Sequence, residues 1–431
     1  MNMIGRIVNL CKSDFGKIFS GNIVVQITTV LQAVLVSRIL GPEGKGLFVG
    51  IILWPTIIAG FSILGLYTGI AKLSAVNTIF DKWNLAKTAL NASIIVGGAG
   101  TIISCVISPI LVNQSHSGLT HIVLIFSSFV LINNVARCFN AIDHGRKDFT
   151  RYSITRSILN PIFFIGLLLL YLTDKLDLSN VVLSFLFANF IVCFIRVLLT
   201  LNSQRHKKTA YPTCKLFKYS LKFSIADLSE PIYAYFDKAI MALVLLSYDL
   251  GIYTTAYSAA SIINILSNVY GTKLFSDMAS GSAVSAINTA LRHNLILMGL
   301  AGICLGVMMP FLIPLVFGLE FSPAIIPGVL LIMTCIMQGQ SYIIERSILA
   351  IGFPYAGAKA KAVNMIILTV LAFTFKLCGF INIYIMVAIM TICQMIYLIY
   401  MFVQVKSLCN LKLELLPRRS DFRHLIQRLV K

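Results

Sequence analysis

The fold is decided by the stretch Ser37-Arg38-Ile39-Leu40-Gly41-Pro42-Glu43-Gly44-Lys45-Gly46-Leu47-Phe48. It is the first polar, glycine-rich break after a long apolar run, and another long apolar run follows it at once. Proline fixes φ and glycine permits turn conformations that other residues resist, so the pattern predicts two apolar helices joined by a tight turn. A weaker copy of the pattern occurs at Leu246-Ser247-Tyr248-Asp249-Leu250-Gly251-Ile252-Tyr253. The sequence therefore indicates two related halves.

Composition places the chain in a membrane. Of its 431 residues, 58% are hydrophobic and only 12% are charged, and the mean hydropathy is +0.88. Soluble domains carry roughly 25% charged and about 45–50% apolar residues, so a soluble core does not account for this composition.

Apolar runs of about 20 residues, the length that spans a membrane as a helix, recur along both halves. The predicted helices of the first half are 16–40, 47–71, 86–112, 118–140, 152–173 and 179–201, and those of the second are 219–247, 252–275, 293–317, 323–346, 357–378 and 381–404. The expected fold is an all-α polytopic membrane protein with twelve transmembrane helices.

The basic residues predict the topology. With the N-terminus in the cytoplasm, nearly all of the 35 Lys and Arg residues fall in cytoplasmic segments. The exceptions are Arg38, Lys45, Lys175 and Lys376 at outer ends and Lys238 inside a helix. The positive-inside rule therefore places both termini in the cytoplasm. The same rule accounts for the net charge of +19 without a nucleic-acid partner.

The predicted organisation has four parts. Residues 1–201 form an N-terminal six-helix bundle, 202–218 a basic cytoplasmic linker, 219–404 a C-terminal six-helix bundle, and 405–431 a basic cytoplasmic tail. Gly46 corresponds to Gly251, and Gly145 corresponds to Gly352 at nearly the same spacing. Six helices per half give both halves the same orientation, which predicts a pseudo-twofold axis along the membrane normal.

Several short motifs carry a family resemblance. They are the stretch Ser37 to Gly46, Leu64-Gly65-Leu66, Asp237 followed by Leu250-Gly251-Ile252-Tyr253, and Phe317-Gly318-Leu319-Glu320-Phe321. In these motifs the chain resembles the Wzx-type O-antigen and polysaccharide flippases of the multidrug/oligosaccharidyl-lipid/polysaccharide (MOP) exporter superfamily. The resemblance implies two six-helix bundles around a central cavity that opens alternately to either side of a bacterial cytoplasmic (inner) membrane.

The same resemblance implies the cargo and the partners. The cargo would be an undecaprenyl-pyrophosphate-linked oligosaccharide, a repeat unit of O-antigen or a related surface polysaccharide. Further partners would be the lipid bilayer and the polysaccharide polymerase and assembly machinery, with H⁺ or Na⁺ as a candidate coupling ion. No cofactor, metal site or catalytic residue is expected.

Charged residues inside predicted helices mark the candidate translocation cavity, because a charge deep in a membrane helix is costly unless it faces a cavity or a partner. Asp227, Glu230, Asp237 and Lys238 fall within about a 100° arc of the helix 219–247, with Tyr233 at its edge. The alternative for Asp237 and Lys238 is an ion pair that serves packing alone.

Polar residues of the first helix and basic residues at helix ends complete the candidate set. Asn22, Gln26 and Thr29 share one face of the helix 16–40, where they would bind sugars or bridge helices. The candidates for binding pyrophosphate, which guanidinium groups pair with well, are Arg38 at an outer end and Arg137, Arg156 and Lys72 near cytoplasmic ends. Snorkelling and the positive-inside rule are the alternatives for these cations.

Three other function classes compete with a flippase. A cation-coupled multidrug antiporter of the same superfamily would use an acidic residue in the first helix, where this chain has glutamines, or Asp237. A polysaccharide polymerase or ligase would need a large outward-facing loop, and the predicted outer loops are short. A non-transporting membrane scaffold is the third. The sequence has no GxxxxGK[ST] phosphate loop, which excludes ATP hydrolysis by this chain.

Overall fold

The structure is a computed structural model. It describes residues 14–75, 82–112, 117–146, 148–201, 212–279, 286–351 and 353–409, in which all regular secondary structure is helical. The chain divides into two compact units, Met1–Ala239 and Ile240–Lys431, here called unit 1 and unit 2. The division falls inside a helix, between residues 239 and 240. Residues 202–211 of the predicted linker lie outside the described part. Of the predicted tail, 410–431 also lie outside it.

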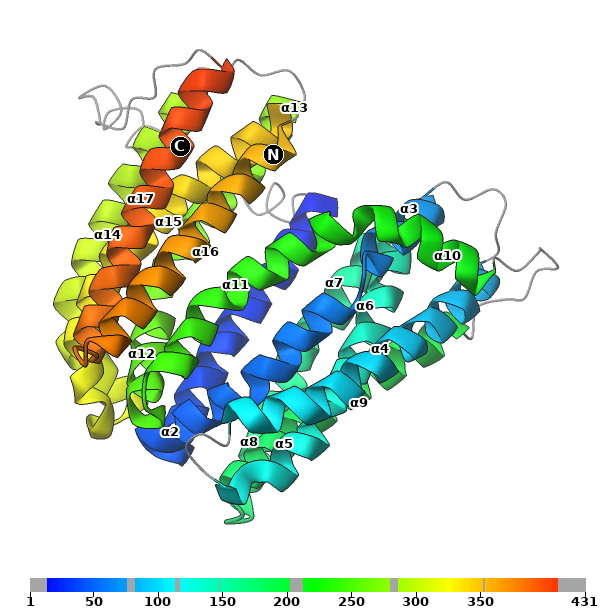
Figure 1. Ribbon diagram of the computed structural model, residues 1–431, viewed down its shortest axis with the longest axis horizontal. Helices are drawn as coiled ribbons and strands as arrows, with labels where there is room; N and C mark the ends of the chain where they lie inside the picture. Colours follow the sequence, from blue (N-terminus) through cyan, green and yellow to red (C-terminus); the bar gives the residue numbers. More distant parts are fainter. Residues whose placement is uncertain are drawn as a thin grey trace, which may run out of the picture. The chain divides into compact units, whose positions relative to one another are not determined.

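Unit 1 is a bundle of long helices and shorter helical turns (Figure 1). Its elements are α2 (Asp14–Ser62), α3 (Leu66–Ala75), α4 (Lys82–Val112), η1 (Ser117–Leu119), α5 (Thr120–Ser127), α6 (Phe129–Gly145), α7 (Phe149–Ser157), α8 (Leu159–Leu172), α9 (Leu178–Leu201), α10 (Thr213–Ser220) and η2 (Leu221–Phe223), followed by α11 (Ser224–Val244), which continues into unit 2.

Unit 2 is also helical throughout its described residues. Its elements after α11 are α12 (Ser247–Ala260), η3 (Ser261–Ile263), α13 (Asn264–Ala279), α14 (Ala286–Phe317), η4 (Leu319–Ala324), α15 (Ile325–Ile351), α16 (Pro354–Leu377) and α17 (Ile383–Cys409). Helix α15 is central to the unit, since it packs against α12, α13, α14, α16 and α17.

The glycine-rich stretch of the first half bends the chain as predicted. Helix α2 contains the first predicted helix and most of the second, 47–71, whose end falls in α3. Gly41 breaks α2 with φ 65° and ψ −176°. Lys45 is buried beyond this kink and donates a 2.7 Å hydrogen bond to Ser37 Oγ, which ties the two sides of the corner together. A second break, at Leu64 and Gly65 with φ 47° and 76°, separates α2 from α3.

The corresponding corner of the second half is built differently. Leu246 has an extended backbone with ψ 158° and precedes the first turn of α12. Burial raises the pKa of the Asp249 carboxyl in this corner above its ordinary value.

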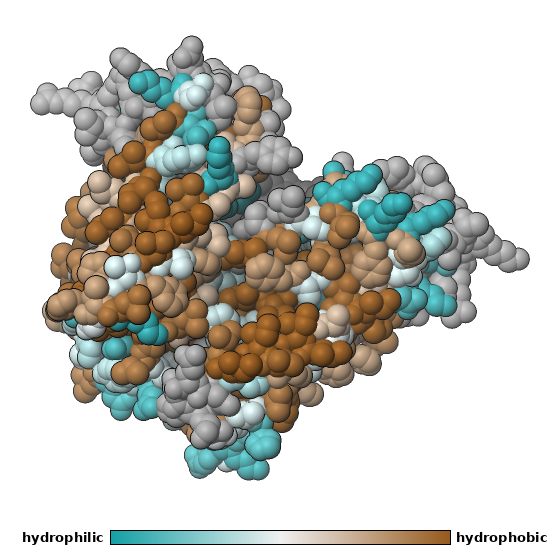
Figure 2. All heavy atoms as spheres, viewed as in Figure 1, coloured by the Kyte–Doolittle hydropathy of each residue, from teal (hydrophilic) through white to brown (hydrophobic). Residues whose placement is uncertain are grey.

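The described helices are those of a membrane protein. Nine helical stretches within the described residues are long and apolar enough to cross a membrane, among them Thr28–Ser62, Asn84–Val112 and Ala286–Phe317. The full count of twelve, the repeat axis and the direction of insertion stay predictions. Large apolar side chains cover the sides of these helices, as Ile102 and Ile110 of α4 do at 69% and 63% exposure. Figure 2 shows this hydrophobic surface, with hydrophilic residues gathered near the end of α10.

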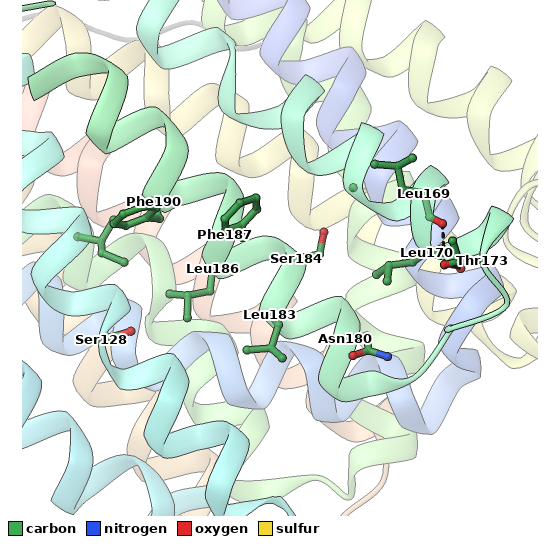
Figure 3. A pocket seen from close by; sticks show the side chains of 12 residues that line it. Ser128, Leu169, Leu170, Thr173, Asn180, Leu183, Ser184, Leu186, Phe187 and Phe190 are labelled. Atoms are coloured by element: carbon green, nitrogen blue, oxygen red, sulfur yellow. Dashed lines mark hydrogen bonds between the residues drawn. The ribbon is translucent and has the colours of Figure 1, made fainter. Parts of the chain in front are cut away.

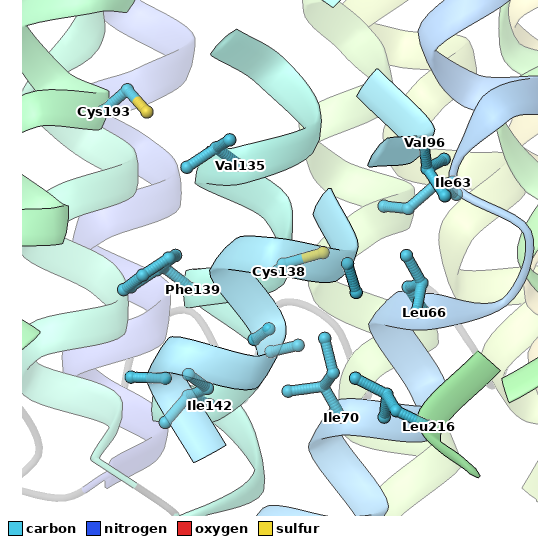
Figure 4. Packing of buried hydrophobic residues seen from close by; sticks show 14 residues of the cluster. Ile63, Leu66, Ile70, Val96, Val135, Cys138, Phe139, Ile142, Cys193 and Leu216 are labelled. Carbon is cyan, nitrogen blue, oxygen red and sulfur yellow. The ribbon is translucent and has the colours of Figure 1, made fainter. Parts of the chain in front are cut away.

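The core of unit 1 lies among α3, α4, α6, α9 and α10 (Figure 4). Ile70, Phe139 and Ile142 are fully buried there, together with the thiol-bearing Cys138. Since apolar contacts contribute little to helix association in lipid, close packing has to hold these helices together. The glycines permit it: a Cβ added at Gly145 would lie 2.1 Å from the carbonyl oxygen of Ala71.

Candidate functional site

The site is built on α3, whose first turn is held by α10 and α11. Asp227 accepts hydrogen bonds from the backbone N–H of Thr68 at 3.1 Å and from its hydroxyl at 2.5 Å. That N–H belongs to the first turn of a helix and has no partner within the helix, and a carboxylate there also meets the positive end of the helix dipole. Asp227, predicted to face the translocation cavity, thus caps α3.

Two glycines let α10 approach α3 closely. A Cβ added at Gly65 would lie 2.2 Å from the carbonyl oxygen of Ser220, and a Cβ added at Gly69 would lie 2.2 Å from the Ser220 hydroxyl oxygen. Gly65 also has a positive φ that other residues adopt only with strain. The start of α3 is therefore fixed against its neighbours by hydrogen bonds and by close backbone packing.

Three aromatic rings from three helices form a column beside this anchored turn. The ring of His144, on α6, stacks on Tyr67 of α3 with 6.1 Å between centroids and on Tyr152 of α7 with 5.4 Å. Both pairs are inclined by 29°, and the Tyr67 hydroxyl lies 3.3 Å from His144 Nδ1. Offset stacking at these separations is favourable. His144 is exposed, and the two tyrosines are half-buried.

A buried charge cluster lies next to the column, on α6, α7 and α9. The carboxylate of Asp143 is fully buried and lies 3.6 Å from Arg151 Nε. Arg196, only 1% exposed, lies within electrostatic reach of the same carboxylate and donates to the Thr155 hydroxyl and to the carbonyl of Ala136. A buried charge is tolerated when an opposite charge lies close to it, and Arg151 and Arg196 supply that charge for Asp143.

Arg151 connects this cluster to the column. It donates a 3.0 Å hydrogen bond to the Thr200 hydroxyl of α9, and its backbone N–H donates to the side chain of Asp148, which caps the start of α7. Tyr152 is the next residue along α7, so the contacts of Arg151 also fix the position of that ring.

The other predicted cavity residues of α11 are less closely described. Tyr233, Asp237 and Lys238 are all half-buried, and each takes part in a polar, ring or electrostatic contact. The Lys238 ammonium lies 5.6 Å from the ring centroid of Tyr235, a cation–π contact. The Glu230 side chain lies outside the described residues.

In the first helix, the described polar groups bridge helices. Asn160 of α8 donates to the Thr29 hydroxyl at 2.9 Å and to the carbonyl of Val25 at 3.1 Å, and Gln32 donates back to the carbonyl of Asn160. The contact of Thr29 with Asn160 bridges two helices, which is the alternative to sugar binding for this residue. Thr29 also keeps an exposed surface. The side chains of the other two predicted residues, Asn22 and Gln26, lie outside the described part.

The four predicted pyrophosphate candidates occupy different settings. Arg38 is exposed at the glycine-rich corner, and Lys72 is exposed with its ammonium 4.3 Å from the ring centroid of Phe223. Arg137 is half-buried on α6, and both it and Asp227 lie within electrostatic reach of the Cys138 thiol. The Arg156 side chain is outside the described residues. The structure therefore places Arg137 near the anchored turn of α3.

Two grooves on unit 1 lack the polar lining that a glycan needs. One, of about 660 Å³, runs along α8 and α9 past Leu183, Phe187 and Phe190 (Figure 3). Thr173 and Asn180 at its end donate to the carbonyls of Leu169 and Lys175, so their donor groups are used locally. The other, of about 680 Å³, lies between α2 and α4 and is almost wholly apolar. Both fit acyl chains better than sugars.

Sequence reasoning missed the column and the buried charge cluster. Tyr67, His144 and Tyr152 lie in separate segments, and each is unremarkable near the end of a membrane helix. Arg151 and Arg196 were counted with the cytoplasmic positive charge, Arg196 was in addition a residue that could bind pyrophosphate at a cytoplasmic helix end, and Asp143 was not singled out. The pattern that could have found Asp143 is its position as an acid beside a dense group of arginines.

The long apolar helices define the class of the protein as a polytopic, all-helical membrane protein. The same fold is found in a solved structure of the lipid II flippase MurJ in an inward closed conformation, with a TM-score of 0.73 and 16% identity over 90% of this chain and 87% of that one. An inward-facing multidrug resistance transporter of the MATE family and MOP superfamily aligns with a TM-score of 0.68 and 15% identity over 90% and 96%.

Comparison of sequences identifies the family. Residues 12–275 match the model of the polysaccharide biosynthesis protein family, and the chain belongs to that family. The probable low-salt glycan biosynthesis flippase Agl15 of Haloferax volcanii is 24% identical over 234 residues, which are 52% of this chain and 49% of that protein. The chain spans about half the length of this curated relative.

Proposed function

We propose that this chain is a flippase that moves an undecaprenyl-pyrophosphate-linked oligosaccharide from the cytoplasmic to the outer face of a bacterial cytoplasmic membrane. It works by alternating access, with both termini in the cytoplasm. The pyrophosphate and the glycan cross along polar surfaces of the protein, while the polyprenyl tail stays in the lipid. The cargo is a repeat unit of O-antigen or a related surface polysaccharide.

One observation carries the proposal: the family match of residues 12–275 falls on a fold shared with a lipid II flippase. The matched range contains all of unit 1 from the start of α2 to its end in α11. The curated relative, by its name, is also a glycan biosynthesis flippase. The family match and the name of this relative therefore support glycan export as the proposed function.

The charges of unit 1 supply what such a cargo requires. Moving a pyrophosphate through hydrocarbon without compensation costs many kcal/mol, so its path needs cations and hydrogen-bond donors. Arg137 and Lys72 lie near predicted cytoplasmic ends, where loading begins, and Lys238 with Asp237 provides charge along α11. Guanidinium groups are suited to this task because they pair bidentately with phosphate oxygens.

A cation-coupled multidrug antiporter is the second candidate, because the MATE transporter has the same fold. Its distinguishing feature would be an acid whose protonation or Na⁺ binding drives transport, and Asp237 is the candidate for that role. Asp237→Asn should then abolish pH-driven drug efflux. A flippase that does not couple through Asp237 would keep its glycan transport in this variant.

Disruption of the gene tests the proposed function. In a strain without a redundant flippase, we expect lipid-linked oligosaccharide to accumulate on the cytoplasmic face and surface glycan to disappear. A plasmid copy of the intact gene should restore the glycan. Normal surface glycan in the disrupted strain would overturn the proposal.

A further inference from the structure

The column of Tyr67, His144 and Tyr152 has the properties of a binding platform. Its rings come from three helices, α3, α6 and α7, and its central ring is exposed. Aromatic faces carry partial negative charge and attract the weakly positive C–H groups that line one face of a pyranose ring. An aromatic surface that water can reach, at the end of a membrane bundle, is therefore suited to a sugar.

The column is also rigid, which lowers the entropic cost of binding. Tyr67 lies inside the anchored turn, between Gly65, which packs closely against α10, and Thr68, whose N–H donates to Asp227. His144 precedes Gly145, where α6 approaches the carbonyl of Ala71 too closely for any side chain. Tyr152 follows Arg151, which contacts α6 and α9. For each ring, a neighbouring residue in the sequence makes polar or close-packing contacts with other helices, and these contacts hold the ring in place.

A cation for the pyrophosphate lies on the same helix. Arg137 and His144 are one heptad apart on α6, which places them within about 20° on one face and about 10 Å apart along the axis. That separation suits a sugar joined to a pyrophosphate. Arg137 is half-buried, and its charge lies within electrostatic reach of the Cys138 thiol.

Resting on the proposed function, we propose that the Tyr67–His144–Tyr152 column is the loading subsite for the first sugar of the lipid-linked glycan, with Arg137 binding its pyrophosphate. The column recognises the apolar face of a pyranose and not one particular sugar. It therefore adds affinity for the glycosylated lipid over the bare lipid pyrophosphate.

A general interfacial role explains these rings less well. Tyrosines gather at membrane–water interfaces as separate amphipathic anchors. Here Tyr67 and Tyr152 stack on a histidine, which is not a typical anchor, and Tyr67 shares a hydrogen bond with it. Tyr171 of α8, 61% exposed and outside the column, is an example of a single exposed tyrosine and serves as a control.

The test measures binding of two probes to the full-length protein in lipid nanodiscs. The probes are undecaprenyl pyrophosphate and undecaprenyl-pyrophosphate-N-acetylglucosamine. In the native protein the sugar should tighten binding about fivefold, the scale of one aromatic stacking contact. Tyr152→Leu and Tyr67→Leu should abolish this gain and leave the affinity for undecaprenyl pyrophosphate unchanged. Tyr152→Phe, which keeps the ring, and Tyr171→Leu should retain the gain.

Comparing two probes within each variant separates recognition from folding. If the column only supported the bundle, Tyr152→Leu would lower the melting temperature and reduce the affinity for both probes by the same factor. That result would overturn the proposed subsite. Equal affinity of the native protein for both probes would also overturn it but leave the proposed function standing. Failure of the native protein to bind either probe would overturn both.

Discussion

The two units differ in the chemistry of the polar contacts that they bury. In unit 1 the carboxylate of Asp143 is fully buried beside Arg151, and Arg196 is 1% exposed. In unit 2 the described ion pair, Lys361 with Glu345 at 2.6 Å, keeps 16% and 26% of its side-chain surface exposed. Of these two ion pairs, that of unit 1 is the more deeply buried, although unit 2 also buries a cation, Arg292, which is 9% exposed.

The interior contacts of unit 2 are mainly between neutral groups. Ser267 donates to the amide oxygen of Asn294 at 3.2 Å, and the hydroxyls of Thr334 and Thr391 share a 2.8 Å hydrogen bond. Such contacts hold membrane helices together at little cost. Charge, by contrast, is expensive to bury. Under the proposed function, we therefore expect the cations of unit 1 to contact the anionic cargo, whereas these polar contacts of unit 2 hold helices together.

The largest expected effect comes from removing the buried carboxylate. Asp143→Ala leaves Arg151 and Arg196 without their shared countercharge, which should destabilise the protein by about 3 kcal/mol or more. Lys361→Met, at the partly exposed pair of unit 2, should cost about 1 kcal/mol or less. Thermal unfolding in a mild detergent measures both. Equal losses of stability in the two variants would show that the two units do not differ in how strongly they depend on these ion pairs.

Substitutions at the glycines where two helices of unit 1 pack closely should have the next largest effect on stability. Gly65→Ala introduces a Cβ 2.2 Å from the Ser220 carbonyl at a positive φ, and we expect a loss of about 2 kcal/mol or more. Gly299→Ala in α14 is the matched control, since its Cβ would meet nothing within 4 Å and alanine favours a helix by roughly 0.5–1 kcal/mol. A stable Gly65→Ala protein would argue against the packing of α3 on α10.

The cap of α3 should contribute an intermediate effect. Asp227→Asn keeps an acceptor for Thr68 but removes the charge at the helix N-terminus, for an expected cost of about 1 kcal/mol. Hydrogen exchange at the start of α3 provides the readout, because loss of the cap should raise exchange there before other parts of unit 1. Unchanged exchange in α3 would contradict the capping role.

The smallest expected effect lies in unit 2. Thr391→Val removes one neutral hydrogen bond between helices, with Thr334, and one to the Val387 carbonyl of its own helix. Hydrogen bonds between membrane helices contribute about 0.6 kcal/mol on average. We expect a similarly small change in stability and no change in glycan transport, measured as surface glycan in the complemented strain. Lost transport in a stably folded Thr391→Val protein would place cargo chemistry in unit 2 as well.

Much of the fold was predictable because apolar runs of membrane length are a strong signal. The predicted helices 86–112 and 293–317 correspond to α4 and α14, with ends shifted by several residues. The positive φ of Gly41 was expected from its Gly-Pro sequence. The break at Leu64 was not, because it depends on α10 packing against the start of α3, a contact distant in sequence.

The site was less predictable because its contacts join distant segments. The acids of α11 were visible as costly charges in an apolar helix, but Asp227 contacts a backbone N–H 159 residues away, which no local pattern indicates. The aromatic column depends on how α3, α6 and α7 come together. Sequence patterns located the charges of this protein, and tertiary structure decided which ones hold helices and which remain available for cargo.

Transport in proteoliposomes tests the central claim most directly. The lipid-linked glycan that accumulates in the disrupted strain is reconstituted with the full-length protein, and periodate added outside oxidises the glycan that has reached the outer leaflet. We predict that the native protein exposes nearly all of the glycan, that Arg137→Ala slows exposure about tenfold or more, and that Thr391→Val matches the native rate. Exposure no greater than in protein-free liposomes would contradict the account.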